Sequence, residues 1–428
     1  MDWKKAGIFG AFAITGIWIA SISLMYFMIF LVVAVFLEIF SFLLVNNLRK
    51  DFQWLITKKD ENPELDSAGL EKFIEHGFDP ELGWIRKPGT SKEEIGKYGK
   101  TSYHIGKNGS RANPGHEKLP SLISLHGDSF IFGRQVNDNE TIQWFLSEFA
   151  KTNVLNFGVG NYGIDQSFLR LKREFPKNRT KIVIMGIVPS TIVRILSVWK
   201  HYNEYGNTFG FKPRFFLKNG KLELFRNPIT KKSEFLNYSK FIKSIRSHDY
   251  FYYSKFKKEM IVFPYTVSIL SQPLRNIPLI FSVIKNNWSK AERDKPYPAP
   301  MKIIMKINLL LRLNLYRNNP EAVLLLERII EEFADYAKKN NAIPVFLMMP
   351  QKDDILFIRK SKDYFYSRMI DRISEKLFTI DLTDELMLHE NLDMIYSDDN
   401  QYGGHFSRYG SRFVAKSIFN RLRKWKII

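Results

Sequence analysis

The chain has 428 residues, of which 45% are hydrophobic, and its 64 Lys and Arg against 44 Asp and Glu give a formal net charge of +20. Such a length and composition suffice for a membrane anchor and one large domain, and they exclude a disordered chain. The absence of cysteine excludes disulfides, thiolate nucleophiles and cysteine-based metal sites. The positive charge is scattered and accompanies no nucleic-acid-binding motif, so it predicts contact with an anionic membrane surface and not with nucleic acid.

A long apolar segment from Ala6 to Leu48 opens the chain and predicts a membrane anchor. Between Lys5 and Arg49 the only side chain that is normally charged at neutral pH is Glu38. Because about 20 apolar residues cross a bilayer once, this segment is either a tight two-pass hairpin or one pass that continues as a helix against a membrane partner. A carboxylate in such a run is costly unless it is paired, so we expect Glu38 to contact a partner or Arg49.

The basic residues beside this segment bear on its orientation. Lys4 and Lys5 precede it, and Arg49 and Lys50 follow it. Positively charged flanks tend to stay in the cytoplasm, which favours a hairpin with a cytoplasmic body. A single pass would instead carry the body across the membrane, so the residues alone leave both arrangements open.

Composition divides the chain into three parts. Residues 1–50 are the predicted transmembrane anchor. Residues 51–118 are polar and rich in turn residues, which predicts a linker followed by short strands and loops that cap an edge of the domain. Residues 119–428 form the predicted main domain. Within it, residues 195–318 break the alternation of strands and helices, so we expect a mostly helical or irregular insertion there.

The motif His-Gly-Asp-Ser-Phe directly follows an apolar, strand-like run. Gly127 and Asp128 predict a sharp supporting turn that presents Ser129 at the N-terminus of a helix, where free N–H groups and the helix dipole favour an oxyanion. His405 lies in a second motif, Gly-Gly-His-Phe-Ser, close to the end of the chain. A serine hydroxyl becomes a good nucleophile when a neighbouring base takes its proton, so we predict Ser129 as nucleophile and His405 as base.

Further predicted strands follow the serine at intervals. Apolar runs alternate with stretches of helical periodicity, and the strand-like runs are 153–157, 181–185, 343–349 and 377–382. Strands that alternate with helices imply a parallel sheet, and ligands then bind at the carboxyl ends of the strands. We therefore predict an α/β fold in which the turns after the first three strands meet His405 at that edge.

With these motifs the chain resembles the SGNH (GDSL-type) hydrolases, in particular a membrane-anchored branch found in cell-envelope gene sets. The four blocks that carry the resemblance are residues 127–129, 156–166, 189–191 and 404–410. The resemblance implies an SGNH-like three-layer fold, with a central parallel sheet flanked by helices. It also favours a single membrane pass and a catalytic domain outside the cytoplasm.

Two positions that the resemblance assigns to the oxyanion hole depart from the family pattern. Asn161 stands where a glycine usually donates its N–H, and Ser190 stands where an asparagine is usual. Asparagine tolerates a positive φ and keeps its backbone N–H, while serine is a shorter donor. We expect the N–H groups of Ser129 and Asn161, together with Ser190, to hold the oxyanion.

The acid that usually orients the catalytic histidine is also replaced. Tyr402 occupies its position, and it is not charged near neutral pH. Asp399 and Asp398 lie shortly before His405 and could fold back onto its Nδ1, with Asp399 favoured. The alternative is a Ser–His dyad or a site that does not work.

These features predict a membrane-anchored serine esterase or O-acyltransferase that acts on acyl groups of envelope glycans or glycolipids through an acyl-enzyme. No cofactor is expected, and no set of side chains has metal-ligand spacing. Water as acceptor would give an esterase and a sugar hydroxyl a transferase, and the sequence does not distinguish them. The alternative is a catalytically silent module that binds glycan or scaffolds a membrane acyltransferase, which the replacements at Ser190 and Tyr402 favour.

Overall fold

The computed structural model describes residues 3–96, 99–288, 298–398, 402 and 404–428, and the chain forms two compact units. The anchor unit comprises residues 1–64, 201–208 and 250–308, and the core unit comprises residues 65–200, 209–249 and 309–428. The expected insertion, 195–318, therefore contributes to both units. It is mostly helical, as predicted, apart from one β-hairpin.

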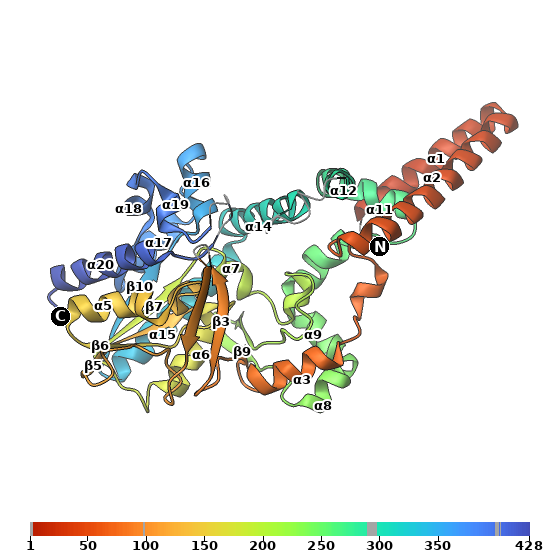
Figure 1. Ribbon diagram of the computed structural model, residues 1–428. Helices are drawn as coiled ribbons and strands as arrows, with labels where there is room; N and C mark the ends of the chain where they lie inside the picture. The colour runs from red at the N-terminus through yellow and green to blue at the C-terminus, as the bar shows by residue number, and fades with distance from the viewer. Residues whose placement is uncertain (1–2, 97–98, 289–297, 399–401, 403) are drawn as a thin grey trace. The chain divides into compact units, whose positions relative to one another are not determined.

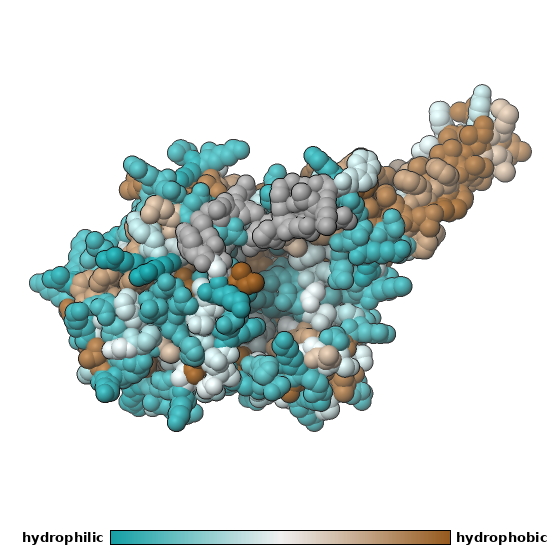
Figure 2. Space-filling view, in the orientation of Figure 1, coloured by the Kyte–Doolittle hydropathy of each residue, from teal (hydrophilic) through white to brown (hydrophobic). Residues whose placement is uncertain are grey.

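Two long apolar helices open the anchor unit. Helix α1 (Trp3–Ile22) and helix α2 (Leu24–Asp51) lie side by side as a hairpin (Figure 1), and each is long and apolar enough to cross a membrane. The surface of this hairpin is largely apolar along its length (Figure 2). Of the two arrangements that the sequence left open, the structure has the pair of helices.

Glu38, the carboxylate in the middle of α2, has a partner of a different kind from Arg49. Its carboxylate accepts hydrogen bonds from the backbone N–H groups of Tyr265 and Thr266, the latter at 3.0 Å. These two residues begin helix α11 (Tyr265–Ser271). Arg49 instead pairs with Asp60. The expectation that Glu38 needs a partner is therefore met by the N-terminus of a helix, where free N–H groups favour a negative charge.

Helices α11 and α12 and part of α14 in the anchor unit pack with the C-terminal half of α2. The other helices described in this unit include the 3-10 helix Lys58–Glu61, the π-helix Tyr252–Phe256, α10 (Lys257–Glu259), α12 (Pro273–Asn287) and the first half of α14 (Ala299–Asn318). Val45 and Leu48 of α2 are buried against Leu279 and Val283 of α12. The apolar run thus continues beyond membrane-spanning length because its end forms part of a packed cluster.

The core unit is built on a five-stranded parallel sheet in the order β11-β10-β7-β5-β6. The strands are β5 (Ser121–Gly127), β6 (Asn153–Asn156), β7 (Ile182–Ile187), β10 (Ile343–Met348) and β11 (Phe378–Asp381). Strand β7 is buried at every position, as a central parallel strand covered on both faces requires. From β5 the chain first moves outward to β6 on one side, and then to β7, β10 and β11 on the other side. The strand order therefore reverses between β5 and β7, and ligands bind at such a switch point.

Helices cover both faces of this sheet, which confirms the predicted α/β fold class and its three layers. Helices α5 and α20 pack together on one face, and α6 and α15 pack together on the other (Figure 1). The helices of the core unit are α3 (Ser67–His76), α4 (Ser129–Phe132), α5 (Ile142–Ala150), α6 (Ile164–Glu174), α7 (Thr191–Arg194), α8 (Lys232–Leu236), α9 (Ile242–His248), α15 (Pro320–Lys339), α16 (Lys352–Ser361), α17 (Ser367–Ser374), α18 (Thr383–Leu388), α19 (Leu392–Ile395) and α20 (Arg408–Lys424).

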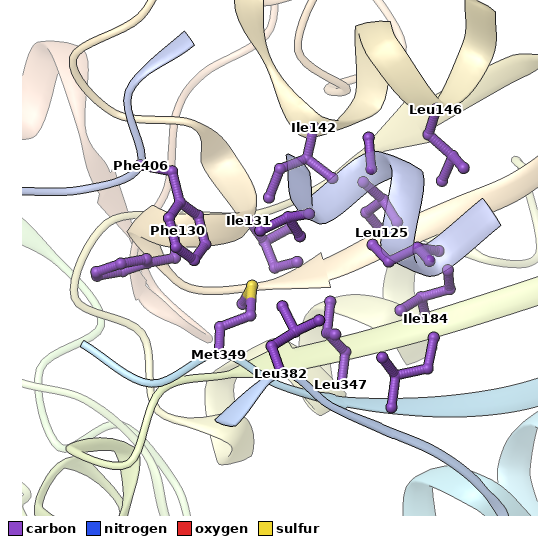
Figure 3. Close-up of a cluster of buried hydrophobic side chains, with 14 of the residues drawn as sticks. Leu125, Phe130, Ile131, Ile142, Leu146, Ile184, Leu347, Met349, Leu382 and Phe406 are labelled. Atoms are coloured by element: carbon purple, nitrogen blue, oxygen red, sulfur yellow. The ribbon is translucent and has the colours of Figure 1, made fainter. Parts of the chain in front are cut away.

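The main apolar core lies between the sheet and the layer of α5 and α20. Leu125, Ile184 and Leu347 project from adjacent strands towards Ile142 and Leu146 of α5 (Figure 3). Because alternate residues of a strand point to opposite faces, this one face fixes the register of the sheet. The carboxyl ends of β5 and β7 are thereby held together.

Three small antiparallel hairpins complete the core unit. They are β1–β2 (Phe78–Asp79 and Gly83–Trp84), β3–β4 (Ser91–Gly96 and Gly99–His104) and β8–β9 (Arg214–Lys218 and Lys221–Phe225). The first two lie in the stretch for which turn residues predicted short strands and loops.

Candidate active site

The turn after β5 depends on a glycine. Gly127 has φ of +156°, and a Cβ atom there would lie 2.2 Å from the carbonyl oxygen of Gly186 on the adjacent strand β7. Only glycine allows this approach. Asp128 then caps α4, since its Oδ1 accepts a hydrogen bond from the N–H of Phe130 at 2.8 Å. Ser129 is consequently the first residue of α4, as the motif predicted.

Ser129 and His405 are brought together. Ser129 Oγ lies 2.8 Å from His405 Nε2, although the two residues come from opposite ends of the core unit. The loop that carries His405 is held in place by a hydrogen bond from the N–H of Ser397 to the carbonyl of His405 at 2.7 Å. Ser407 then caps α20 by accepting from the N–H of Gly410. The 2.8 Å between Ser129 Oγ and His405 Nε2 is within hydrogen-bond distance.

The other ring nitrogen of His405 faces an amide where we expected a carboxylate. Its Nδ1 lies 3.1 Å from Gln135 Oε1, which also accepts a hydrogen bond from Ser397 Oγ at 2.6 Å. Asp399 lies outside the described residues. The backbone carbonyl of Asp398 accepts from Lys352. Among the described residues, Gln135 is the side chain at His405 Nδ1, and it can orient the ring without adding a charge.

His405 is neutral in this environment. Burial and the positive charges of Arg134 and Arg194 lower the pKa of His405 to about 3. The ring packs on Phe130 with centroids 4.9 Å apart. A neutral imidazole whose Nδ1–H is donated to Gln135 leaves Nε2 free to accept the proton of Ser129.

The guanidinium group of Arg194 links the segments that follow strands β5, β6 and β7. Arg194, the last residue of α7, places its Nη1 2.7 Å from Asp128 Oδ2 and 3.1 Å from the carbonyl oxygen of Tyr162. Burial raises the pKa of Asp128, and Arg194 opposes that rise. Asp128 thus holds the turn through Arg194 and the N–H of Phe130.

The two predicted oxyanion residues follow β6 and β7. Asn161 has φ of +66°, the left-handed conformation expected there, and it precedes Tyr162. Ser190 Oγ is buried and has no hydrogen-bond partner among the described residues, so its hydroxyl is available as a donor. Their part in holding an oxyanion stays a prediction.

Sequence reasoning missed Gln135, Ser397 and Arg194. Gln135 has φ of +68°, and nothing in the sequence indicates that its side chain turns towards a histidine 270 residues later. Arg194 gave a weak signal, because an arginine at the end of an apolar turn must find a partner. Within the described ranges no group of His, Asp and Glu side chains could hold a metal ion.

Comparison with solved structures gives weak likenesses, two of which follow. No protein-family profile and no curated protein matches the chain. A proposed lipolytic protein of the G-D-S-L family from Desulfitobacterium hafniense DCB-2 is 11% identical, with 71% of this chain and 99% of that chain covered and a TM-score of 0.33. A second solved structure is 13% identical, with coverage of 71% and 97% and a TM-score of 0.31. Likenesses this weak carry no argument, so the fold and the site stand on their own geometry.

Proposed function

We propose that this chain is a membrane-anchored serine esterase or O-acyltransferase that acts on acyl groups of envelope glycans or glycolipids. The observation that carries the proposal is the 2.8 Å distance between Ser129 Oγ and His405 Nε2 at the carboxyl edge of the sheet. An α/β sheet places ligands at this edge. The apolar hairpin α1–α2 supports placement at a membrane.

The reaction would proceed in two balanced steps. Ser129 Oγ attacks the ester carbonyl carbon while His405 Nε2 takes the hydroxyl proton, and the resulting oxyanion is held by the N–H groups of Ser129 and Asn161 with Ser190. The intermediate collapses to acyl-Ser129, and the departing alcohol receives the proton from His405. Water or a sugar hydroxyl then attacks the acyl-enzyme by the same route in reverse, which gives hydrolysis or transfer.

The second candidate is the silent module that binds glycan or scaffolds a membrane acyltransferase. The environment of His405 favours it. Burial, Arg134 and Arg194 lower the pKa of His405 to about 3, and a base is most efficient when its pKa lies near the working pH. A neutral Gln135 also stabilises an imidazolium less than a carboxylate would.

A fluorophosphonate probe distinguishes the two candidates because it labels only an activated serine. We expect the full chain in detergent to be labelled, Ser129→Ala to lose the label, and the exposed control Ser233→Ala to keep it. An unlabelled native chain, or labelling of Ser129→Ala equal to that of the native chain, would contradict the esterase proposal.

The proposal places the core unit outside the cytoplasm, where envelope glycans lie. The basic flanks of the hairpin favour the opposite side. Because the chain has no cysteine, a single cysteine at the exposed Lys177 decides between them. We expect a membrane-impermeant maleimide to label Lys177→Cys in intact cells. Labelling only after lysis would place the unit in the cytoplasm and remove envelope glycans as substrates.

A further inference from the structure

A cavity of about 580 Å³ lies in the anchor unit beside the first turns of α1. One wall is formed by the start of α1, and the other by the π-helix, α10 and the segment that leads into α11. The first turns of α1 lie next to α11 in Figure 1. Pockets of this volume hold small ligands in other proteins, and the proposed reaction does not use this one.

The walls of the cavity are held by hydrogen bonds. Lys5 Nζ donates to the carbonyl of Met260 at 2.8 Å, which joins α1 to the opposite wall. Ser268 Oγ donates to the carbonyl of Val262 at 2.6 Å and closes the loop between them. Glu38 fixes the start of α11 against α2. The cavity is therefore formed before any ligand binds.

The lining combines apolar surface with positive charge. Its apolar side chains include Phe9, Met260, Val262, Phe263, Pro264 and Val267. Its charged side chains are Lys5, Lys257 and Lys258, and no acidic side chain lines it within the described part of the chain. This pairing suits a molecule with an anionic group and a hydrocarbon tail.

The three lysines are not equivalent. Lys5 is buried and donates to Met260, and Lys257 lies 3.2 Å from Glu61. Lys258 is exposed and makes no ion pair or hydrogen bond with a described residue. Its ammonium group can thus meet an anion without breaking an existing contact.

The position of α1 places this cavity at the level of lipid headgroups. Its 20 residues span about 30 Å at 1.5 Å per residue, which matches a hydrocarbon core of about 30 Å. Trp3 and Lys4 lie at its end, and tryptophan and lysine favour the membrane interface. Three aromatic side chains of the lining are mostly exposed, at 75% for Trp3, 66% for Tyr253 and 74% for Phe263.

We propose that this cavity binds an anionic phospholipid of the surrounding bilayer. The lipid phosphate lies beside Lys258, with Lys257 behind it. The upper part of an acyl chain lies along Phe9, Phe263 and Val267. Anionic lipids attract basic side chains near the surface, and the apolar lining adds contact that a free anion cannot use.

Native mass spectrometry of the full chain in neutral detergent tests this assignment. We expect phosphatidylglycerol to bind at least tenfold more tightly than phosphatidylcholine, and inorganic phosphate at millimolar concentration to leave that binding unchanged. Lys258→Glu should reduce phosphatidylglycerol binding tenfold or more, and Lys258→Arg should retain it. Phe263→Ser should weaken both lipids, because it removes apolar contact.

The matched control is Lys59→Glu, which reverses an exposed lysine of the same unit outside the cavity lining. It should bind phosphatidylglycerol as the native chain does. Equal binding of the two lipids, equal effects of Lys258→Glu and Lys59→Glu, or displacement by inorganic phosphate would each overturn the proposal. Circular dichroism melting of each variant confirms that the fold is retained before binding is compared.

Discussion

Charges meet different kinds of partner at two places in the molecule: at Asp128 in the core unit, and at Glu38 and Lys5 in the apolar helices of the anchor unit. In the core unit Asp128 meets an opposite charge, Arg194, at 2.7 Å. In the anchor helices Glu38 meets the N–H groups at the start of α11, and Lys5 meets the carbonyl of Met260. Burying a second charge adds its own desolvation cost, whereas backbone groups at helix ends are already dehydrated dipoles. The salt bridge between Asp128 and Arg194 holds the turn that carries Ser129. The contacts of Glu38 and Lys5 with backbone groups join α1 and α2 to the rest of the anchor unit.

The largest expected effect is on the proposed reaction of Ser129 and His405. Ser129→Ala and His405→Ala should each lower kcat/KM for p-nitrophenyl acetate by about 1000-fold or more, since members of a nucleophile and base pair act as a unit. For the same reason the double variant should lose little more than either single variant. Full activity of Ser129→Ala would remove Ser129 from the mechanism.

The next largest effect is expected from removing the salt bridge between Arg194 and Asp128 in the core unit. Arg194→Met leaves the buried carboxylate of Asp128 without its counterion, so it should lower the free energy of unfolding by about 3–5 kcal/mol. Adding Asp128→Asn should recover part of that loss. Thermal melting measures both variants.

The control for this variant is an exposed pair. The side chains of Arg317 and Asp363 are 40% and 42% exposed, so Arg317→Met should cost less than about 1 kcal/mol. If Arg194→Met were as mild as this control, the contact between Arg194 and Asp128 would not hold the turns.

Gln135→Glu sharpens the comparison by adding a charge where the core unit uses an amide. The native rate should stay constant from pH 8 to below pH 5, because His405 remains neutral until the pH approaches its pKa of about 3. A carboxylate at Nδ1 favours the imidazolium and should raise that pKa by about 1–3 units. The acid limb of the pH–rate profile should move to higher pH, and the rate near pH 7.5 should rise severalfold.

Gln53→Glu adds the same charge in the anchor unit and serves as the control. Its acid limb should coincide with that of the native chain. If the acid limb of Gln135→Glu also stayed in place, Gln135 would not be the residue that orients His405. The roles predicted for Asp399 and Asp398 are tested in the same assay by the double Asn variant, which should slow turnover if either carboxylate assists His405.

The smallest expected effect concerns the anchor side. Glu38→Gln removes the negative charge at the N-terminus of α11 but keeps one acceptor oxygen, so it should lower stability by about 1 kcal/mol. Thermal melting of the full chain in detergent measures this loss. The exposed Glu64→Gln should leave the melting temperature unchanged, and an equal shift in both variants would contradict the capping role of Glu38.

Local patterns in the sequence predicted the strands and turns of the core unit because these depend mainly on residues that are close together in the sequence. The apolar runs at β7 and β10 are buried almost throughout, and such runs can be recognised without knowing their neighbours. The turn at Gly127 and Asp128 was equally visible, since the requirement for a glycine and the helix cap involve adjacent residues. Ser129 and His405 could be predicted as a pair because each lies in a short motif of its own, and the structure places their side chains 2.8 Å apart.

Contacts between distant side chains were beyond sequence reasoning. The partner of His405 Nδ1 was sought among nearby acids, yet Gln135 lies 270 residues away in the sequence. The partners of Glu38 are backbone N–H groups, which every residue except proline has, so no side-chain pattern identifies them. Only the assembled fold shows which helix end comes close.

The contact between Glu38 and α11 also has a consequence for the order in which the chain is made. Tyr265 follows Glu38 by 227 residues, and synthesis at about 5–20 residues per second takes about 11–45 seconds to cover that distance. During this interval the newly made hairpin carries a carboxylate that its permanent partner cannot yet reach. The hairpin is thus completed late in synthesis, once Tyr265 and Thr266 have been made.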